Sequence, residues 1–581
     1  MTVRLGPGFR AVRCIPVLVC LFILFSQAPC HAVRIAADGR PLATIIIGSG
    51  QPETVRYAAR EFRSYVEKIS GARLPIQTAP PDEKPSMERG RDYVLIGESP
   101  YTRKLGVSAA GLRPDGFRII ARGNCLVLIG RDYAGPPMTG MSRTFSLNET
   151  YNPDTGISAF GQTGTLYAVY RFLEKYLGVR WYMPGRLGEV IEKRASIRIA
   201  DTQFEASPDF TYRRWYFAYG FGSRQYDEAA RWYRRAGFGA DFPVELNDTF
   251  DIFAKKYLGV HPEYFYCNGK VRPHHIVLDQ PGVAGQFVKD INAYFDSHPL
   301  QRVYPLMADD FYLGTNSGKD KRLKAADDPS MGPEGRFSDY MWGFVNRVAE
   351  EVYKTHPHRF IGGIAYQDYR LPPRKIKRFP PNVLVMICKL RMQSANAKER
   401  AKVDALIRQW RKKCANIYVW EYYNWYYAGS EQGEPFIFPH LIARDLKFLK
   451  GMSRGEFIEA ETAKPPLSIA YPGLTHLNLY VTARLLWDAD LNVDRLLDDY
   501  YRRFYGPGAP EMKEFFEAAE RYWTQWVRGQ RIRKWYWEGT FRLAPRQREK
   551  LLGYLEKARE KTGDTVYGKR VQLIIGEMSH A

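Results

Sequence analysis

The chain has 581 residues, more than a single hydrophobic core usually holds, so we expect two or three domains. Its 45% hydrophobic and 25% charged residues are ordinary proportions for a globular protein. The net charge of +22 favours a polyanionic partner. No nucleic-acid-binding motif is present, so an acidic polysaccharide is the better fit, and a basic surface that only aids solubility is the alternative.

Aromatic residues make up 14% of the sequence, which is a high share. Flat amphipathic rings suit sites that bind a ligand with an apolar face and polar edges, as sugars have. A large core rich in tyrosine is the equally weighted alternative.

Residues 1–32 have the pattern of a secretory signal peptide. Three arginines precede the short apolar run at 14–25, and small residues precede a cleavage site near Ala32. The run is too short for a comfortable membrane span, although an uncleaved anchor is the alternative. We therefore predict export to the periplasm or the extracellular space, without a stable membrane span.

The four cysteines after the signal lie far apart and form no C-x-x-C pair: Cys125, Cys267, Cys388 and Cys414. We expect buried free thiols and no metal site. The histidines at 261, 274 and 275 have no metal-ligand spacing, which favours structural or substrate-binding roles. No phosphate-binding loop or G-x-S-x-G motif is present, and no cofactor is predicted.

Residues 33–204 are predicted to form a small α+β domain. Short apolar runs predict strands at 43–48, 92–97, 116–122 and 125–131. Amphipathic spacing, followed by glycine, predicts helices over 52–71 and 164–178, the second followed by a strand. Two helices against about five short strands predict an α+β sandwich layer.

Residues 205–490 alternate strand-like and helical patterns, which predicts a parallel sheet and favours a (β/α)8 TIM barrel. Helices are expected over 337–356 and 397–414. The expected strands are 212–220, 273–278, 303–310, 359–369, 382–389, 416–425 and 455–461, and one more near 240–247 is poorly defined. A C-terminal helical region, 491–581, is predicted to have helices at 493–506, 510–527 and 545–563.

Carboxylates recur where these strands end, which is where barrel enzymes hold their chemistry. The candidate catalytic residues are Asp310, Asp368 and Glu421. Glycoside hydrolysis needs one carboxyl as acid and another as base or nucleophile, with aromatic walls for the sugar ring. Asp368 as a turn residue and Glu421 as an ion-paired structural residue are the alternatives.

The candidate substrate-binding residues are aromatic, acidic or basic side chains at the same strand ends. They are Asp309, Arg213, Arg214, Tyr366, Trp420, Tyr422, Trp425, Glu459 and Glu461. Either arginine is expected to bind a substrate carboxylate. Strand alternation places Glu459 and Glu461 on one face, where pairing with nearby arginines is the alternative role.

Several segments resemble a known family. "AAREFRSYVEKISGARLPI", "GTLYAVYRFLEKYLGVRWYMPGRLGEVI", "IAYQDYRLPPRKIKRFPPNVLVMIC" and "YVTARLLWDADLNVDRLLDDYYRRFYGPGAPEM" are similar to the bacterial domain-of-unknown-function family 4838. That family looks related to the α-glucuronidases of glycoside hydrolase family 67 and, more distantly, the β-hexosaminidases of family 20. The resemblance implies a small α/β domain before a (β/α)8 barrel.

The resemblance also suggests roles for carboxylates. Family 20 enzymes use an adjacent Asp-Glu pair after a barrel strand. The Asp309–Asp310 pair is similar in placement, but Asp310 replaces the glutamate. Asp368 and Glu421 resemble the Asp and Glu pair with which family 67 enzymes activate water.

The sequence therefore predicts an exported glycoside hydrolase for a complex, uronic-acid-containing polysaccharide, with Asp310 as general acid and Glu421 or Asp368 as base or nucleophile. A noncatalytic carbohydrate-binding protein on a hydrolase scaffold is the second hypothesis. A polysaccharide lyase with a tyrosine or histidine base is the third. The oligomeric state is not predicted.

Overall fold

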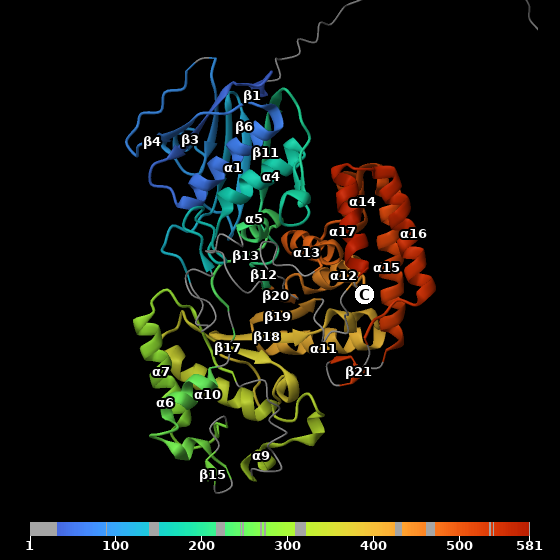
Figure 1. The fold of residues 1–581 in the computed structure, drawn as a ribbon. Helices are drawn as coiled ribbons and strands as arrows, with labels where there is room; N and C mark the ends of the chain where they lie inside the picture. Colours follow the sequence, from blue (N-terminus) through green and yellow to red (C-terminus); the bar gives the residue numbers. More distant parts are fainter. Residues whose placement is uncertain are drawn as a thin grey trace, which may run out of the picture.

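The computed structural model describes residues 32–88, 90–138, 150–216, 227–244, 246, 249–267, 270–271, 275–307, 321–423, 433–460, 471–530, 532–533, 536–537 and 540–579. The predicted signal peptide lies almost wholly outside these ranges, apart from Ala32, where the first strand begins. Within the ranges, no helix is both long and apolar enough to cross a membrane. A layered N-terminal part, a long central sheet and a group of C-terminal helices are visible in Figure 1.

The N-terminal part is a six-stranded sheet with helices packed against it. Helix α1 (Glu53–Ser70) contacts β3, and α4 (Gly164–Leu177) contacts β6 and β7. The strands, in spatial order, are β11 (Thr202–Ala206), β6 (Phe117–Arg122), β7 (Cys125–Gly130), β5 (Asp92–Ile96), β3 (Ala43–Gly48) and β4 (Ile76–Ala79). The strands and helices that we predicted here are confirmed. The two edge strands of this sheet were missed, because β11 has no fully buried residue and β4 has one.

The central sheet has seven strands within the described residues. In spatial order they are β13 (Gly239–Ala240), β12 (Tyr212–Tyr216), β20 (Gly455–Ala460), β19 (Asn416–Tyr423), β18 (Val383–Lys389), β17 (Phe360–Ala365) and β16 (Val303–Pro305). Only β13 runs antiparallel to its neighbour. Strand β12 pairs with β20, so the first and last long strands meet.

The predicted eight-stranded barrel is confirmed only as a mixed α/β fold with a half-barrel sheet. Strands β13 and β16 stand at its two edges and are not paired with each other within the described ranges. The strand expected at 273–278 is wrong for residues 275–278. There the Val277 amide donates to the Tyr264 carbonyl and the Leu278 amide to the Tyr340 hydroxyl, so both are satisfied without a sheet neighbour.

Helices cover the outer face of this sheet. Helix α10 (Ser338–Thr355) places Trp342 close to Gly363 of β17. Helices α11 (Ala397–Lys413) and α13 (Pro472–Trp487) contact β19 and β12, and the other helices of this part are α5 (Asp227–Ala236), α6 (Phe250–Tyr257), α7 (Val283–Ser297) and α12 (Pro439–Leu449). The alternation of strand and helix that the sequence predicted is therefore present in this part.

The C-terminal helices are α14 (Val493–Tyr505), α15 (Ala509–Gly529), α16 (Pro545–Thr562) and α17 (Val566–Met578). The first three were predicted and the last was not. The buried residues Val571, Ile574 and Met578 are spaced three and four apart, which is the signal that indicates α17.

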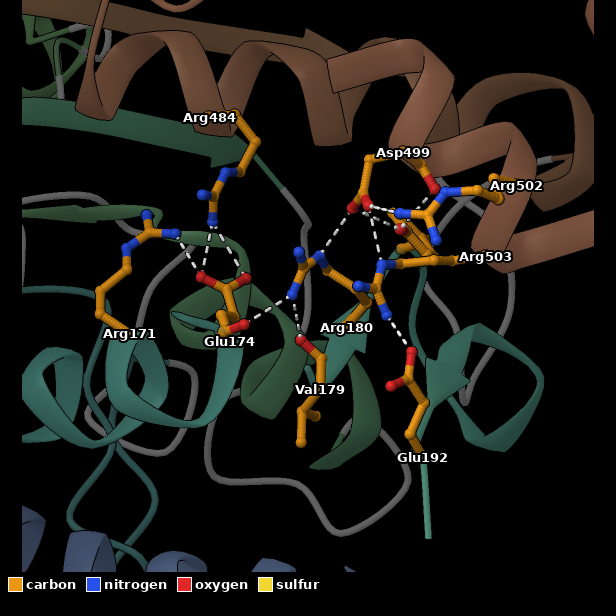
Figure 2. Close-up of polar contacts among 10 residues, drawn as sticks. Arg171, Glu174, Val179, Arg180, Glu192, Arg484, Asp499, Arg502 and Arg503 are labelled. Carbon is orange, nitrogen blue, oxygen red and sulfur yellow. Dashed lines mark hydrogen bonds and ion pairs between the residues drawn. The ribbon is translucent and has the colours of Figure 1, made fainter. Parts of the chain in front are cut away.

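Ion pairs connect the N-terminal part to the later helices (Figure 2). Glu174 of α4 accepts from Arg484 of α13 at 2.8 Å, and Arg180 donates to Asp499 of α14 at 3.0 Å. Arg503 of α14 contacts both Asp499 and Glu192. We call the following set the interface network: Arg171, Glu174, Arg180, Glu192, Arg484, Asp499, Arg502 and Arg503.

Candidate active site

Strand pairing sorts the predicted site residues onto two faces of the central sheet. The register aligns Arg214 with Phe457, Phe457 with Trp420, and Trp420 with Cys388. Two residues further along the same strands, Tyr422 is aligned with Glu459. Because side chains alternate along a strand, these residues lie on one face, and Arg213 and Glu421 lie on the other.

The first face carries an aromatic–carboxylate cluster, which consists of Tyr366, Trp420, Tyr422, Phe457 and Glu459. The indole Nε1 of Trp420 donates to Oε2 of Glu459 at 2.9 Å. The Trp420 ring centroid lies 4.5 Å from that of Phe457 and 6.4 Å from that of Tyr422. All except Phe457 are only half-buried. The cluster therefore combines ring surface with a carboxylate at the carboxyl ends of three parallel strands, the paired β19 and β20 and, beyond β18, β17.

Tyr422 is kept protonated by its surroundings. Burial raises the pKa of its phenol well above 10, and Cys388, Glu459 and Tyr366 raise it further. A phenol in this state donates a hydrogen bond but is a poor proton acceptor near neutral pH. The raised pKa thus favours Tyr422 as a hydrogen-bond donor to a polar group over the base of a lyase.

The opposite face carries a buried charge cluster, which consists of Lys389, Arg391, Glu421, Asp445 and Glu456. Lys389 Nζ lies 2.8 Å from Glu421 and 3.1 Å from Asp445. Arg391 contacts Glu456 at 2.5 Å and Asp445 at 3.4 Å, and its backbone amide donates to Glu421. Each of these side chains is at most 8% exposed. The cluster ties the ends of β18, β19 and β20 to helix α12.

Glu421 is therefore placed differently from our expectation. Its side chain has no exposed surface and faces the helix layer. Burial raises the pKa of Glu421, and Lys389 and Arg391 oppose that rise. A carboxyl enclosed in this way does not reach the face on which Trp420 and Glu459 lie, so its contacts favour the ion-paired structural alternative.

Arg213 is also enclosed. Its guanidinium donates to Asp115 at 2.7 Å, to the Gly237 carbonyl and to the Phe210 carbonyl, and no part of it is exposed. These contacts connect the central sheet to the N-terminal part. Arg213 therefore has no surface with which to bind a substrate carboxylate.

Arg214 lies on the same face as the aromatic–carboxylate cluster but is 4% exposed. Its guanidinium lies 4.8 Å from the Phe160 ring centroid and donates to the Tyr233 hydroxyl. The strand register of Arg214 agrees with the predicted binding role, because it places the residue on the face of the cluster. Its low exposure does not agree with that role.

Asp368 lies in the short 3-10 helix η5 (Gln367–Tyr369), directly after β17. Gln367 has φ of 50°, a left-handed conformation that is uncommon for a non-glycine residue. The turn leaves Asp368 only 2% exposed, and its carbonyl accepts from the Phe337 amide. The position and burial of Asp368 agree with the turn residue that the sequence offered as the alternative role, and its catalytic role stays a prediction.

Four predicted site residues lie outside the described ranges: Asp309, Asp310, Trp425 and Glu461. The Asp309–Asp310 pair follows the last residue of β16 by four positions. Sequence reasoning missed Phe457 and Cys388 as neighbours of the cluster. Phe457 lies two residues before Glu459 and so shares its face of β20. Cys388 could be placed beside them only once the pairing of β18, β19 and β20 was known. Cys125, Cys388 and Cys414 are buried free thiols, as predicted.

Comparisons with known proteins were made for both structure and sequence. A family GH115 4-O-methyl-α-glucuronidase with specificity for decorated arabinogalactans has a similar structure, with a TM-score of 0.51, 12% identity, and coverage of 93% of this chain and 71% of that chain. This likeness shows a shared glycoside hydrolase-like fold. No curated protein has a matching sequence.

Two further solved structures are less similar. One is a Streptomyces plicatus β-hexosaminidase (TM-score 0.40, 13% identity, 86% of this chain and 92% of that one). The other is a Clostridium perfringens family 89 glycoside hydrolase (TM-score 0.44, 10% identity, 90% and 60%). The model of the family "Domain of unknown function (DUF4838)" matches residues 183–517, which include both clusters. The match spans more than half of the chain, which therefore belongs to the DUF4838 family.

Proposed function

We propose that this protein is an exported glycoside hydrolase that acts on a complex, uronic-acid-containing polysaccharide. The observation that carries the proposal is the aromatic–carboxylate cluster at the carboxyl ends of β17, β19 and β20. Half-buried rings beside a carboxylate fit a sugar, which stacks its apolar face on a ring and offers hydroxyl groups at its edge.

We assign the acid and base roles to Glu459 and Asp310. Glu459 lies near the carboxyl end of β20, and Asp310 follows β16 in the sequence. The Trp420 indole donates to Oε2 of the Glu459 carboxyl and so holds it in place beside the rings. Glu421 acts as a positioning residue, since its ion pairs hold β19 in register with β18 and β20. Asp368 stays a candidate second carboxyl, at the end of β17.

A noncatalytic carbohydrate-binding protein is the second candidate function. The Trp420–Glu459 hydrogen bond favours it, because a carboxylate that already accepts a donor is stabilised in its charged form and is a weaker proton donor. In that case the same cluster would bind sugar without cleaving it.

The test is release of reducing ends from a panel of acidic and neutral polysaccharides. The wild-type protein is compared with Glu459→Gln, Asp310→Asn and, as a matched control, Glu205→Gln on the exposed side of β11. Loss of a catalytic acid or base lowers turnover by roughly 100-fold or more. We expect that loss for the first two variants and none for the control.

Trp420→Phe is a second probe of the cluster, because it removes the indole donor and keeps an aromatic ring. Product release that survives both Glu459→Gln and Asp310→Asn would refute the assigned acid and base. Binding of a polysaccharide by all variants with no product from the wild type would establish the noncatalytic function instead.

A further inference from the structure

A groove on the outer side of the central sheet has no role in the proposed chemistry. It has a volume of about 450 Å³ and lies between residues 330–331, residues 371–374 and the last turns of α11 at Gln409, Lys412 and Lys413. Helix α11 ends at Lys413, and β19 begins three residues later at Asn416. None of the residues that line the groove belongs to the aromatic–carboxylate cluster.

Two cationic segments meet at this groove. Residues 370–382 contain five lysines and arginines and no acid, and residues 405–416 contain four and no acid. Among the exposed members, Lys375, Lys377, Arg378, Arg411 and Lys412 form no ion pair or side-chain hydrogen bond within the described part of the chain, and Arg408 lies over the Phe448 ring. We call Arg374, Lys375, Lys377, Arg378, Arg411 and Lys412 the basic groove; Arg374 and Lys412 line the groove itself, and the other four lie within four positions of them in the sequence.

The two segments are held together by hydrogen bonds. The Phe379 amide donates to the Lys413 carbonyl, and Lys413 Nζ donates to the Ile376 carbonyl. The Trp410 indole donates to the Arg370 carbonyl at 2.8 Å. The charges are therefore presented on a fixed backbone, which lowers the entropic cost of binding an extended ligand.

Helix capping accounts for only part of this charge. Arg411 and Lys412 lie in the last turn of α11, where cations interact favourably with the helix dipole. Lys375, Lys377 and Arg378 lie in a loop and have no such partner. Arg374 differs from them, because it contacts Asp328 at 3.4 Å and the Ser330 hydroxyl at 2.7 Å.

We propose that the basic groove is a second carbohydrate site, which binds an acidic polysaccharide chain by its carboxylates. The apolar walls, Leu371, Pro372 and Pro373, suit a ring face, and the flanking cations match a repeat of negative charge. The choice of polysaccharide as occupant rests on the proposed function. Binding here would hold the polymer on the enzyme while another part of it is cleaved.

The experiment measures binding of polygalacturonate to the full chain at low ionic strength. The groove variant is Lys375→Gln, Lys377→Gln, Arg378→Gln and Lys412→Gln combined. The control removes four exposed lysines from other helices, with the same change in net charge: Lys255, Lys354, Lys513 and Lys550 to Gln. We expect the groove variant to bind about tenfold more weakly and the control less than about twofold.

Three outcomes decide the proposal. Equal weakening in both variants would show that only net charge matters, and would overturn it. If duplex DNA or phosphatidylserine vesicles bound more tightly than polygalacturonate, and the groove variant lost that binding, the groove would be assigned to another polyanion. That result would also overturn the proposal. Weaker polygalacturonate binding in the groove variant alone supports the proposal. The Glu459→Gln variant should still bind polygalacturonate at the groove. It therefore separates failure of the groove proposal from failure of the proposed hydrolysis.

Discussion

The buried charge cluster and the interface network use the same kinds of side chain in different surroundings. In the cluster the side chains are at most 8% exposed. In the network, Arg180 is 20% exposed, Asp499 25% and Glu192 52% (Figure 2). Water screens the second group but not the first. We therefore expect the cluster to be intolerant of single changes and the network to be forgiving.

The largest effect is expected from Arg391→Gln in the buried charge cluster. It leaves Glu456 and Asp445 buried without their guanidinium partner, and removal of one partner from a buried pair costs about 3–5 kcal/mol. We expect the midpoint of urea unfolding to fall accordingly. Arg546→Gln, on an exposed position of α16 with no ion pair to any described residue, is the control. A shift no larger than that of the control would contradict the difference between the two regions.

A smaller effect is expected from Asp499→Asn in the interface network. Asp499 accepts from Arg180, Arg502 and Arg503, all partly exposed. Solvent-exposed pairs contribute up to about 1 kcal/mol each, so we expect a loss of about 1 kcal/mol. A double-mutant cycle with Arg180→Gln isolates the pair. A coupling energy near that of a buried pair would mean that the network is less screened than its exposure indicates.

The same contrast explains how far the sequence could predict this molecule. Periodicity gave most helices and the main strands, because α1, α10 and α11 bury one face at helical spacing. It could not show that β16 and β13 end the described sheet, since that depends on which strands pair.

The site was predicted less well, for a related reason. The structure brings Trp420, Tyr422 and Glu459 together at strand ends, and their role in binding stays a prediction. Arg213 was placed with them together with its neighbour Arg214, and Glu421 was placed there because it lies between Trp420 and Tyr422 in the sequence. Their partners Asp115 and Lys389 lie 98 and 32 positions away, and only the folded chain shows that those partners enclose them. Face assignment needs register, which local pattern does not supply.

The pH dependence should have opposite signs in the two regions. The pKa of Glu421 is raised by burial above 4.5, so its contribution to stability is complete below pH 4.5 and is lost as the pH rises through the raised pKa. Burial raises the pKa of Asp499, but Arg180 and Arg503 together lower it by a larger amount, so that the pKa lies below 3.8. Its contribution is present above pH 3.8 and is lost as the pH falls through the lowered pKa.

The corresponding measurement is urea unfolding of wild type, Glu421→Gln and Asp499→Asn at several pH values. We expect the destabilisation by Glu421→Gln to shrink as the pH rises. That by Asp499→Asn should shrink as the solution becomes acidic. If both penalties varied with pH in the same direction, the two carboxyls would not differ in the way their surroundings require.

Salt should produce the smallest effect and should separate the regions most directly. The screening length falls from about 30 Å at about 0.01 M salt to about 3 Å at about 1 M. Over that range we expect the Arg180–Asp499 coupling energy to fall by a few tenths of a kcal/mol, because solvent reaches both side chains. The penalty for Arg391→Gln should stay constant, since ions do not enter its surroundings. Each is a difference between variants in the same solution, so general effects of salt on unfolding cancel. A coupling energy insensitive to salt would place the interface network in the same class as the buried charge cluster.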